Sequence, residues 1–319
     1  MFRRLMNPEV FQGNLKKKHY FEGWYFKHVT RAHKFFSFIP GISLAENDSH
    51  AFIQVMDGLT GKTYYLRYPI TDFSWHRNSL YIKVGDSVFT DKGILLNIRD
   101  KDLTLSGLIE FSNMIKYPRS LLSPGIMGWY SFVPFMECNH GIVSVIHDLS
   151  GDVTFDGKSV SLEGGKGYIE KDWGTSFPES WIWIQSNNFD EPGTSFSVSI
   201  AKIPWLGRFF IGFISYLCLG KKFYNFCTYN RSRIVKISHD AGRIGITLSN
   251  AGNILEVEVI ANTFVGLAAP VSGLMTRRIQ ESFNSEVHVM LSDKDNALIY
   301  KGTGVCVGLE VVERIFDYF

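Results

Sequence analysis

The chain has 319 residues, 45% hydrophobic and 20% charged, which is enough for two domains with substantial apolar cores. Its formal net charge of +2 excludes the strongly basic surface with which many proteins bind nucleic acid, so no nucleic-acid partner is expected. The longest basic run, Lys16 to Lys18, is interpreted as a solvated arm. Four widely spaced cysteines include no CxxC pair, which argues against a zinc or thioredoxin-type site and favours free thiols in a reducing cytoplasm.

Short apolar segments bounded by Gly, Asp and Asn follow one another along the chain, which is typical of antiparallel strands joined by turns. The predicted strands cover residues 50–57, 63–68, 73–75, 79–84, 87–90, 93–97, 103–111, 181–187, 195–203, 210–219, 223–229, 233–238, 243–249, 253–261, 285–292 and 296–307. Helix signals are sparse, and short helices are expected only over 274–283 and 309–319. The sequence therefore predicts an all-β fold of sandwich or barrel type with a few short helices.

These strands form two comparable groups on either side of a stretch rich in Gly, Asp, Ser and Lys, residues 152–167. We therefore expect two domains, 1–158 and 159–319. Residues 203–220 are largely apolar, but Pro204 and Arg208 interrupt them, which favours buried strands over a membrane-spanning helix. The first eight residues lack the apolar stretch of a signal peptide, and a cytoplasmic location is expected.

The densest motif of the chain combines charged and aromatic side chains. Glu170, Lys171 and Asp172 precede Trp173, and further aromatic and amide side chains follow at Trp181, Trp183, Gln185 and Asn187. A solvated charge run does not usually include tryptophan, and an apolar core does not usually include three charges in a row. The mixture indicates a pocket in which a few polar groups act within an aromatic wall.

Three separated segments resemble motifs of the tocopherol cyclase family. They read Tyr-Phe-Glu-Gly-Trp-Tyr-Phe-Lys over residues 20–27, Gly-Trp-Tyr-Ser-Phe-Val-Pro-Phe-Met-Glu over 128–137, and Glu-Lys-Asp-Trp-Gly over 170–174, the last followed by Phe177-Pro178 and the Trp, Gln and Asn residues named above. The segments occur in the order of the family. Asp172 stands where the plant enzymes have Asn. After Glu137 this chain has Cys138-Asn139-His140, where the plant enzymes have a different, aromatic-rich sequence.

The resemblance implies a lipocalin-like fold of two antiparallel β-barrel domains, and kinship with carotenoid hydratases and lipocalin-like Diels-Alderases. It implies an intramolecular cyclase that adds a phenol oxygen across an isoprenoid double bond and closes a chroman ring, with no cofactor and no metal. The substrate would be a lipophilic small molecule, so peripheral contact with a membrane is expected. Neither the residues nor the resemblance indicates an oligomeric state.

This reaction needs an acid that stays protonated near neutral pH and a wall that shields a cation. Burial among aromatic side chains raises a carboxyl pKa, and aromatic faces stabilise a cation. The candidate catalytic residues are Glu170, Glu137, Asp172 and His140, where Glu137 and His140 would form a proton relay. The candidate substrate-binding residues are Trp173, Trp181, Trp183, Trp24, Trp129, Tyr130, Gln185 and Asn187.

Each of these residues also has a structural interpretation. The carboxylates could form ion pairs, His140 could lie in the core or at its rim, and the tryptophans could simply fill the core. Glu22 is interpreted as a structural carboxylate that ties the first strand to its neighbours. Two other functions therefore stay open: hydration of an isoprenoid alkene on the same scaffold, and a lipid carrier that does no chemistry.

Overall fold

The computed structural model describes residue 4 and residues 6–134, 136–312 and 314–319. Within these residues the predicted all-β fold is confirmed, because the regular structure consists of strands and short 3-10 helices. Those helices are η1 (Ile70–Asp72), η2 (Gly128–Phe132), η3 (Thr228–Asn230) and η4 (Ile315–Tyr318). Phe135 of the second motif and residues 1–3 and 5 lie outside the described residues. In the described part of the chain, no helix is long and apolar enough to cross a membrane.

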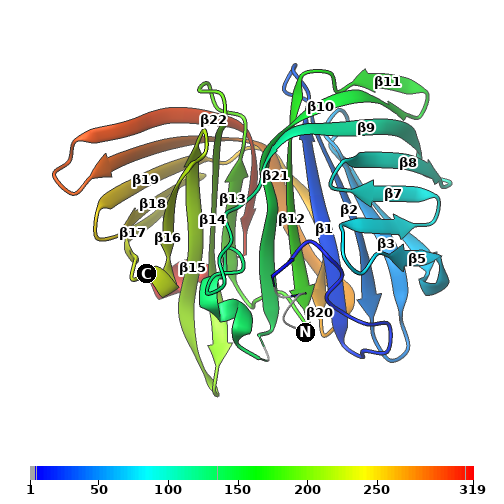
Figure 1. Ribbon diagram of the computed structural model, residues 1–319, viewed down its shortest axis with the longest axis horizontal. Helices are drawn as coiled ribbons and strands as arrows, with labels where there is room; N and C mark the ends of the chain where they lie inside the picture. The colour runs from blue at the N-terminus through cyan, green and yellow to red at the C-terminus, as the bar shows by residue number, and fades with distance from the viewer. Residues whose placement is uncertain (1–3, 5, 135, 313) are drawn as a thin grey trace. The chain divides into compact units, whose positions relative to one another are not determined.

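The chain forms two compact units, each built mainly on one antiparallel sheet (Figure 1). The first comprises Met1–Phe177 and Leu267–Arg278, and the second comprises Pro178–Gly266 and Ile279–Phe319. The chain therefore divides after Phe177, whereas the sequence led us to expect a boundary at residue 158. The glycines near residue 158 do not mark a linker: Gly157 and Gly164 take positive φ at the two ends of a short hairpin strand within the first unit.

The first sheet curls into a barrel, in which β6 lies against β2 and β3. Its spatial order is β4-β3-β2-β1-β12-β10-β9-β8-β7-β6-β5, with β11 paired to β10. The strands are β1 (Tyr20–Val29), β2 (Phe35–Leu44), β3 (His50–Asp57), β4 (Lys62–Pro69), β5 (Phe73–Trp75), β6 (Tyr81–Val84), β7 (Ser87–Thr90), β8 (Gly93–Arg99), β9 (Thr104–Ile115), β10 (Cys138–Phe155), β11 (Lys158–Ser161) and β12 (Gly165–Gly174).

The second sheet has the order β16-β15-β14-β13-β22-β21-β19-β18-β17, with β20 paired to β21. Its strands are β13 (Trp181–Ser186), β14 (Thr194–Trp205), β15 (Arg208–Leu219), β16 (Lys222–Cys227), β17 (Arg233–Asp240), β18 (Arg243–Ser249), β19 (Asn253–Ile260), β20 (Phe264–Val271), β21 (Leu274–Asp293) and β22 (Leu298–Val311).

Burial distinguishes two kinds of strand in the first unit. β8 alternates between buried and exposed residues, as a strand with one face in the core should. In β1 every residue but Gly23 is buried, and β3 is buried throughout, so these strands are covered on both faces. On the face of β12 that points away from the barrel core, Tyr168 and Glu170 are buried as well, whereas Asp172 is partly exposed, and this position makes their chemistry informative.

Two helix predictions are wrong. Residues 274–283 form the first half of β21, and the chain over 309–319 finishes β22 before the single turn η4. The pairing of Glu281 with Glu310 and of Ser282 with Leu309 joins segments far apart in the sequence, and local spacing does not reveal such pairing. Residues 203–220 are strands as expected, but residues 204–209 at the β14–β15 turn are exposed rather than buried.

Candidate functional site

Adjacent strands of the first barrel carry the polar residues of the sequence motifs. β12 lies between β1 and β10, as Figure 1 shows. In this register Tyr25 of β1 pairs with Glu170 of β12, and Asp172 of β12 pairs with His140 of β10. The first and third motifs therefore face each other across a strand pair, and the Cys-Asn-His segment that follows the second motif joins them from the other side.

His140, Glu170 and Asp172 form a compact group, which we call the acid–base cluster. His140 Nδ1 lies 2.8 Å from Asp172 Oδ1, and His140 Nε2 lies 3.6 Å from Glu170 Oε2. Both ring nitrogens thus face a carboxylate. Tyr168, two residues before Glu170 on the same face of β12, donates its hydroxyl hydrogen to Glu170 Oε2 at 2.6 Å. The result is a continuous chain of polar groups from Asp172 to Tyr168.

The electrostatics of the cluster favour a charged imidazole. Burial alone would lower the pKa of His140, but the negative charges of Asp172 and Glu170 outweigh burial and raise the pKa to about 9. At neutral pH His140 therefore holds a proton between two acceptors. Such a group can give up a proton at one side and be reprotonated from the other without any large movement.

Cys138 borders the cluster, with Sγ 4.0 Å from Asp172 Oδ1. Burial, followed by the charges of Asp172 and Glu137, raises the pKa of this thiol well above its usual range. The thiol therefore stays protonated at physiological pH and is a poor nucleophile.

The same three side chains could hold a metal ion. One ligand atom from each of His140, Glu170 and Asp172 lies within 4.8 Å of the others. However, both nitrogens of His140 already face carboxylates, so a metal would have to displace the His140–Asp172 hydrogen bond. A metal ion at this site would therefore compete with the proton on the imidazole.

The opposite face of β12 carries a structural ion pair. On this face Ile169 belongs to the barrel core and Trp173 packs against it, and Lys171 lies between them. Lys171 Nζ bonds Glu22 of β1, and both side chains are fully buried. The ammonium also lies 4.7 Å from the ring centroids of Trp24 and Trp173. Glu22 therefore acts as the structural carboxylate that the sequence suggested.

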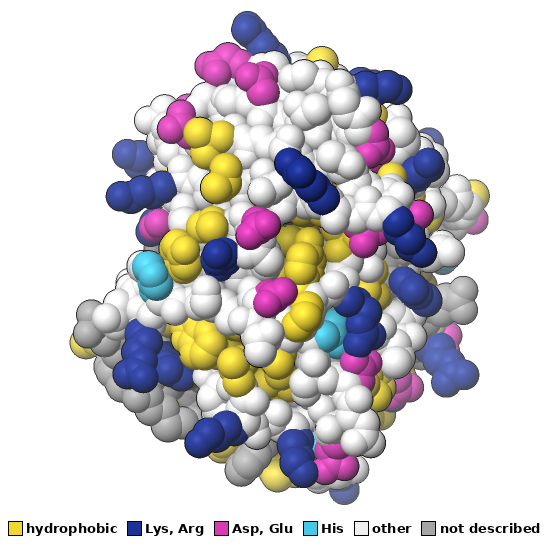
Figure 2. Space-filling view, turned by 90° about the vertical axis from the view of Figure 1, so that its right-hand side faces the viewer, with side chains coloured by type: hydrophobic (Ala, Val, Ile, Leu, Met, Phe, Trp, Pro, Cys, Tyr) yellow, Lys and Arg dark blue, Asp and Glu magenta, His cyan; other side chains and the backbone are white. Residues whose placement is uncertain are grey.

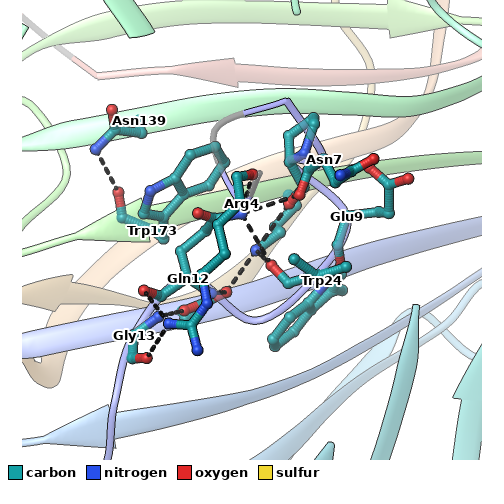
Figure 3. A network of polar contacts seen from close by, with 12 residues as sticks. Arg4, Asn7, Glu9, Gln12, Gly13, Trp24, Asn139 and Trp173 are labelled. Carbon is teal, nitrogen blue, oxygen red and sulfur yellow. Dashed lines mark hydrogen bonds and ion pairs between the residues drawn. The ribbon is translucent and has the colours of Figure 1, made fainter. Parts of the chain in front are cut away.

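The N-terminal segment, residues 6–13, completes this arrangement, and Figure 3 shows its polar contacts. Lys171 Nζ donates to the carbonyl oxygens of Pro8 and Val10 at 2.8 and 2.6 Å. Glu22 accepts hydrogen bonds from the backbone N–H groups of Gln12 and Gly13. One buried ion pair therefore fixes two strands and the segment that crosses them.

The remaining predicted residues of the first unit lie in three places. Trp24 is fully buried, and its Nε1 donates to the Glu9 carbonyl oxygen at 2.8 Å, as Figure 3 shows. Trp129 is exposed and stacks on Tyr130, with ring centroids 4.2 Å apart. The Glu137 carbonyl oxygen accepts from Thr175 N. The structure pairs His140 with Asp172 and Glu170, and the relay of Glu137 and His140 stays a prediction.

Four predicted residues belong to the second unit, on β13 and just after it. Trp181 and Trp183 are buried, and Trp181 Nε1 donates to Glu310 Oε2 at 2.7 Å. Gln185 Nε2 donates to Asn187 Oδ1 at 3.3 Å, and both side chains are buried. In this unit they form a polar and aromatic layer, and their role as substrate-binding residues stays a prediction.

Sequence reasoning missed Tyr168, although its spacing of two residues from Glu170 on a strand was a usable signal. It also missed a histidine pair inside the barrel. His28 of β1 and His147 of β10 both pair with Gly167 of β12, and both rings lie against Phe111, with centroid distances of 5.7 and 4.4 Å. Burial lowers the pKa of His147 to about 3, so this imidazole is neutral.

Solved structures with a similar fold include CghA, with a TM-score of 0.54, 10% identity and coverage of 92% of this chain and 88% of that one. Kievitone hydratase from Nectria haematococca gives a TM-score of 0.50 at 10% identity, over 95% of this chain and 93% of that one. At these identities the likeness concerns the fold. The chain is an all-β protein of the lipocalin-like class.

The family model described as tocopherol cyclase-like matches residues 99–312, which is more than half of the chain. The protein therefore belongs to the tocopherol cyclase-like family, as the three motifs predicted. The chloroplastic tocopherol cyclase of Zea mays is 35% identical over 85 residues, which are 27% of this chain and 18% of that protein. The match thus spans less than a fifth of the length of the maize enzyme.

Proposed function

We propose that this protein is an enzyme that closes a ring by acid-catalysed addition of a phenol to an isoprenoid double bond, as in a tocopherol cyclase. The observation that carries the proposal is His140, held between Asp172 and Glu170 and protonated at neutral pH. The family membership and the aromatic residues of the motifs support the substrate class, a prenylated phenol.

In this proposal the His140–Glu170 pair supplies the proton. Glu170 is the more buried of the two carboxylates and is the end of the relay that meets the alkene. The imidazolium of His140 passes its Nε2 proton to Glu170, which delivers that proton to one alkene carbon, and the phenol oxygen forms a C–O bond to the tertiary carbon beside it. The phenol proton then returns to the pair, so the product is an isomer of the substrate and the enzyme regains its starting state.

Water must be kept from the cation, since it would trap the same intermediate as an alcohol. Tyr168 and Asp172 have supporting roles in this scheme. Tyr168 orients Glu170 through its 2.6 Å hydrogen bond, and Asp172 holds the imidazole ring and its proton in place. Neither has to exchange a proton with the substrate.

The test is mass spectrometry of the purified protein incubated with a prenylated hydroquinone in H2O and in D2O. An isomer of unchanged mass, which carries one deuterium on carbon when formed in D2O, is the expected product. Glu170→Gln should lose it, and an unchanged melting temperature would show that the variant still folds. A product heavier by one water would assign the protein to the hydratases. Tight binding without turnover, unaffected by Glu170→Gln, would contradict the proposal and favour a carrier.

A further inference from the structure

The β14–β15 hairpin of the second unit ends in an apolar tip, residues 204–209. The two strands stay paired up to Trp205 and Arg208, and Leu206 and Gly207 form the two-residue turn between them. All six residues of the tip are exposed. The pairing of β14 with β15 therefore continues up to the turn, and the tip has regular hairpin structure.

Neither the backbone conformation at position 206 nor packing in the core explains why this residue is a leucine. It has φ of 47° and Gly207 has φ of 75°, so both turn residues are left-handed. Hairpin turns with two left-handed residues favour Asn-Gly or Asp-Gly, because a branched apolar side chain is strained there. The Leu206 side chain is 89% exposed. The residue thus costs stability locally and gains no burial within the unit.

The tip is apolar on both of its faces. Cross-strand partners share a face, so Trp205 lies with Arg208 on one side and Pro204 with Phe209 on the other. Trp205 and Phe209 are 39% and 49% exposed. A single exposed apolar side chain is ordinary on a protein surface, whereas three large ones around one projecting turn form a patch that indicates an interaction site.

Two cations flank these side chains. Arg208 is exposed, and among the described residues it forms no ion pair. Lys202 bonds Glu179 at 2.6 Å, and its ammonium lies 4.6 Å from the Phe209 ring centroid and 5.3 Å from that of Tyr318. Phe209 is therefore held in its exposed position by neighbours on the same unit, and Arg208 is free to meet an anion.

We propose that the hairpin tip is a membrane-contact site that inserts Trp205, Leu206 and Phe209 into the interface of a bilayer with anionic head groups. Stable protein interfaces bury about 1,200–2,000 Å² in total, more than six residues can supply. Insertion needs only apolar side chains that reach about 5–10 Å below the head groups. Tryptophan favours that interface, and an adjacent arginine can reach anionic head groups from it. The proposal rests on the tip alone and is independent of the proposed reaction.

The test measures co-sedimentation of the whole protein with vesicles of phosphatidylcholine, with and without phosphatidylglycerol. Leu206→Asn is the informative variant, because it creates the Asn-Gly turn that the backbone prefers and so should fold at least as well. We expect its partition onto mixed vesicles to fall about tenfold, the loss expected from removing one inserted leucine. Leu122→Asn is the matched control, since Leu122 is 82% exposed on the first unit, and it should leave partition unchanged.

A second readout locates the contact. Brominated lipids should quench tryptophan fluorescence of the wild type, and Trp205→Phe should remove most of that quenching. The proposal would be overturned by wild-type protein that sediments with neither vesicle, by Leu206→Asn that partitions like the wild type, or by an equal loss in Leu122→Asn. Turnover of a detergent-solubilised substrate should be the same in Leu206→Asn and wild type, which separates this site from the reaction.

Discussion

Glu22 and Lys171 form a salt bridge across the β1–β12 strand pair, and both side chains are fully buried. An isolated buried charge is far less stable than a pair, so each residue requires the other. The pair also holds the N-terminal segment through the carbonyl oxygens of Pro8 and Val10. The ion pair therefore holds β1, β12 and the N-terminal segment together.

Lys171→Met should destabilise the protein by about 3–5 kcal/mol, because it leaves Glu22 charged and unpaired in the core. The measurement is the free energy of unfolding from urea titration. The double variant Glu22→Gln/Lys171→Met should recover a large part of the loss, since no unpaired charge remains. A double variant as unstable as the sum of the single ones would show that the two residues act separately.

The stability that His140 contributes should depend on pH with a defined sign. Its pKa is about 9 in the folded protein and about 6.5 in an unfolded chain. The contribution is therefore fully present below pH 6.5, declines from there to pH 9, and is gone above pH 9. Unfolding free energies of wild type and His140→Gln should converge as the pH rises through this range. A difference that grows with pH would contradict the assigned charge.

The two carboxylates of the cluster should contribute unequally to activity. Glu170→Gln should lower the rate by about 10²- to 10⁴-fold, the usual range for loss of a general acid. Asp172→Asn should lower it less, because the amide oxygen can still accept the hydrogen bond from His140 Nδ1. It should also shift the alkaline limb of the pH–rate profile to lower pH. The negative charge of Asp172 contributes most to raising the pKa of His140, so its removal lowers that pKa. An unshifted limb would remove His140 from the relay.

Gly167→Ala tests the row of His28, Gly167 and His147. A Cβ at position 167 would lie 2.2 Å from His147 Nε2, so the imidazole would have to move within a packed core. We expect a loss of about 1–3 kcal/mol, as for other overpacked sites. In a protein that already carries His147→Ala, Gly167→Ala should lower the free energy of unfolding much less. The coupling energy from the double-mutant cycle measures this difference. Additive losses would show that another neighbour resists the substitution.

Zinc should act as an inhibitor. A divalent ion bound by His140, Glu170 and Asp172 would take the place of the proton that the reaction needs. Activity should therefore survive treatment with EDTA and fall on addition of Zn²⁺, with weaker inhibition at lower pH. Asp172→Asn should bind Zn²⁺ less tightly. Loss of activity on chelation, restored by metal, would contradict the acid–base scheme.

The sequence predicted most strands because turn residues separate them, and the spacing of two between Glu170 and Asp172 is enough to place both on one face of a strand. It could not place His140 beside them. That position depends on the register between β10 and β12, which pairs residues 32 apart. The helix predicted over 274–283 failed for the same reason, since β21 is stabilised by partners such as Leu309 that local spacing does not reveal.

The alternation of side chains on β12 divides the family signature into two independent halves. Lys171 and Trp173 face the barrel core and serve folding, whereas Glu170 and Asp172 face away from it and carry the proposed chemistry. A chain that keeps the inward half and loses the outward one should still build this barrel while lacking the reaction. Family membership recognised from the inward residues is therefore a statement about architecture, whereas the proposed reaction depends on the outward residues and His140.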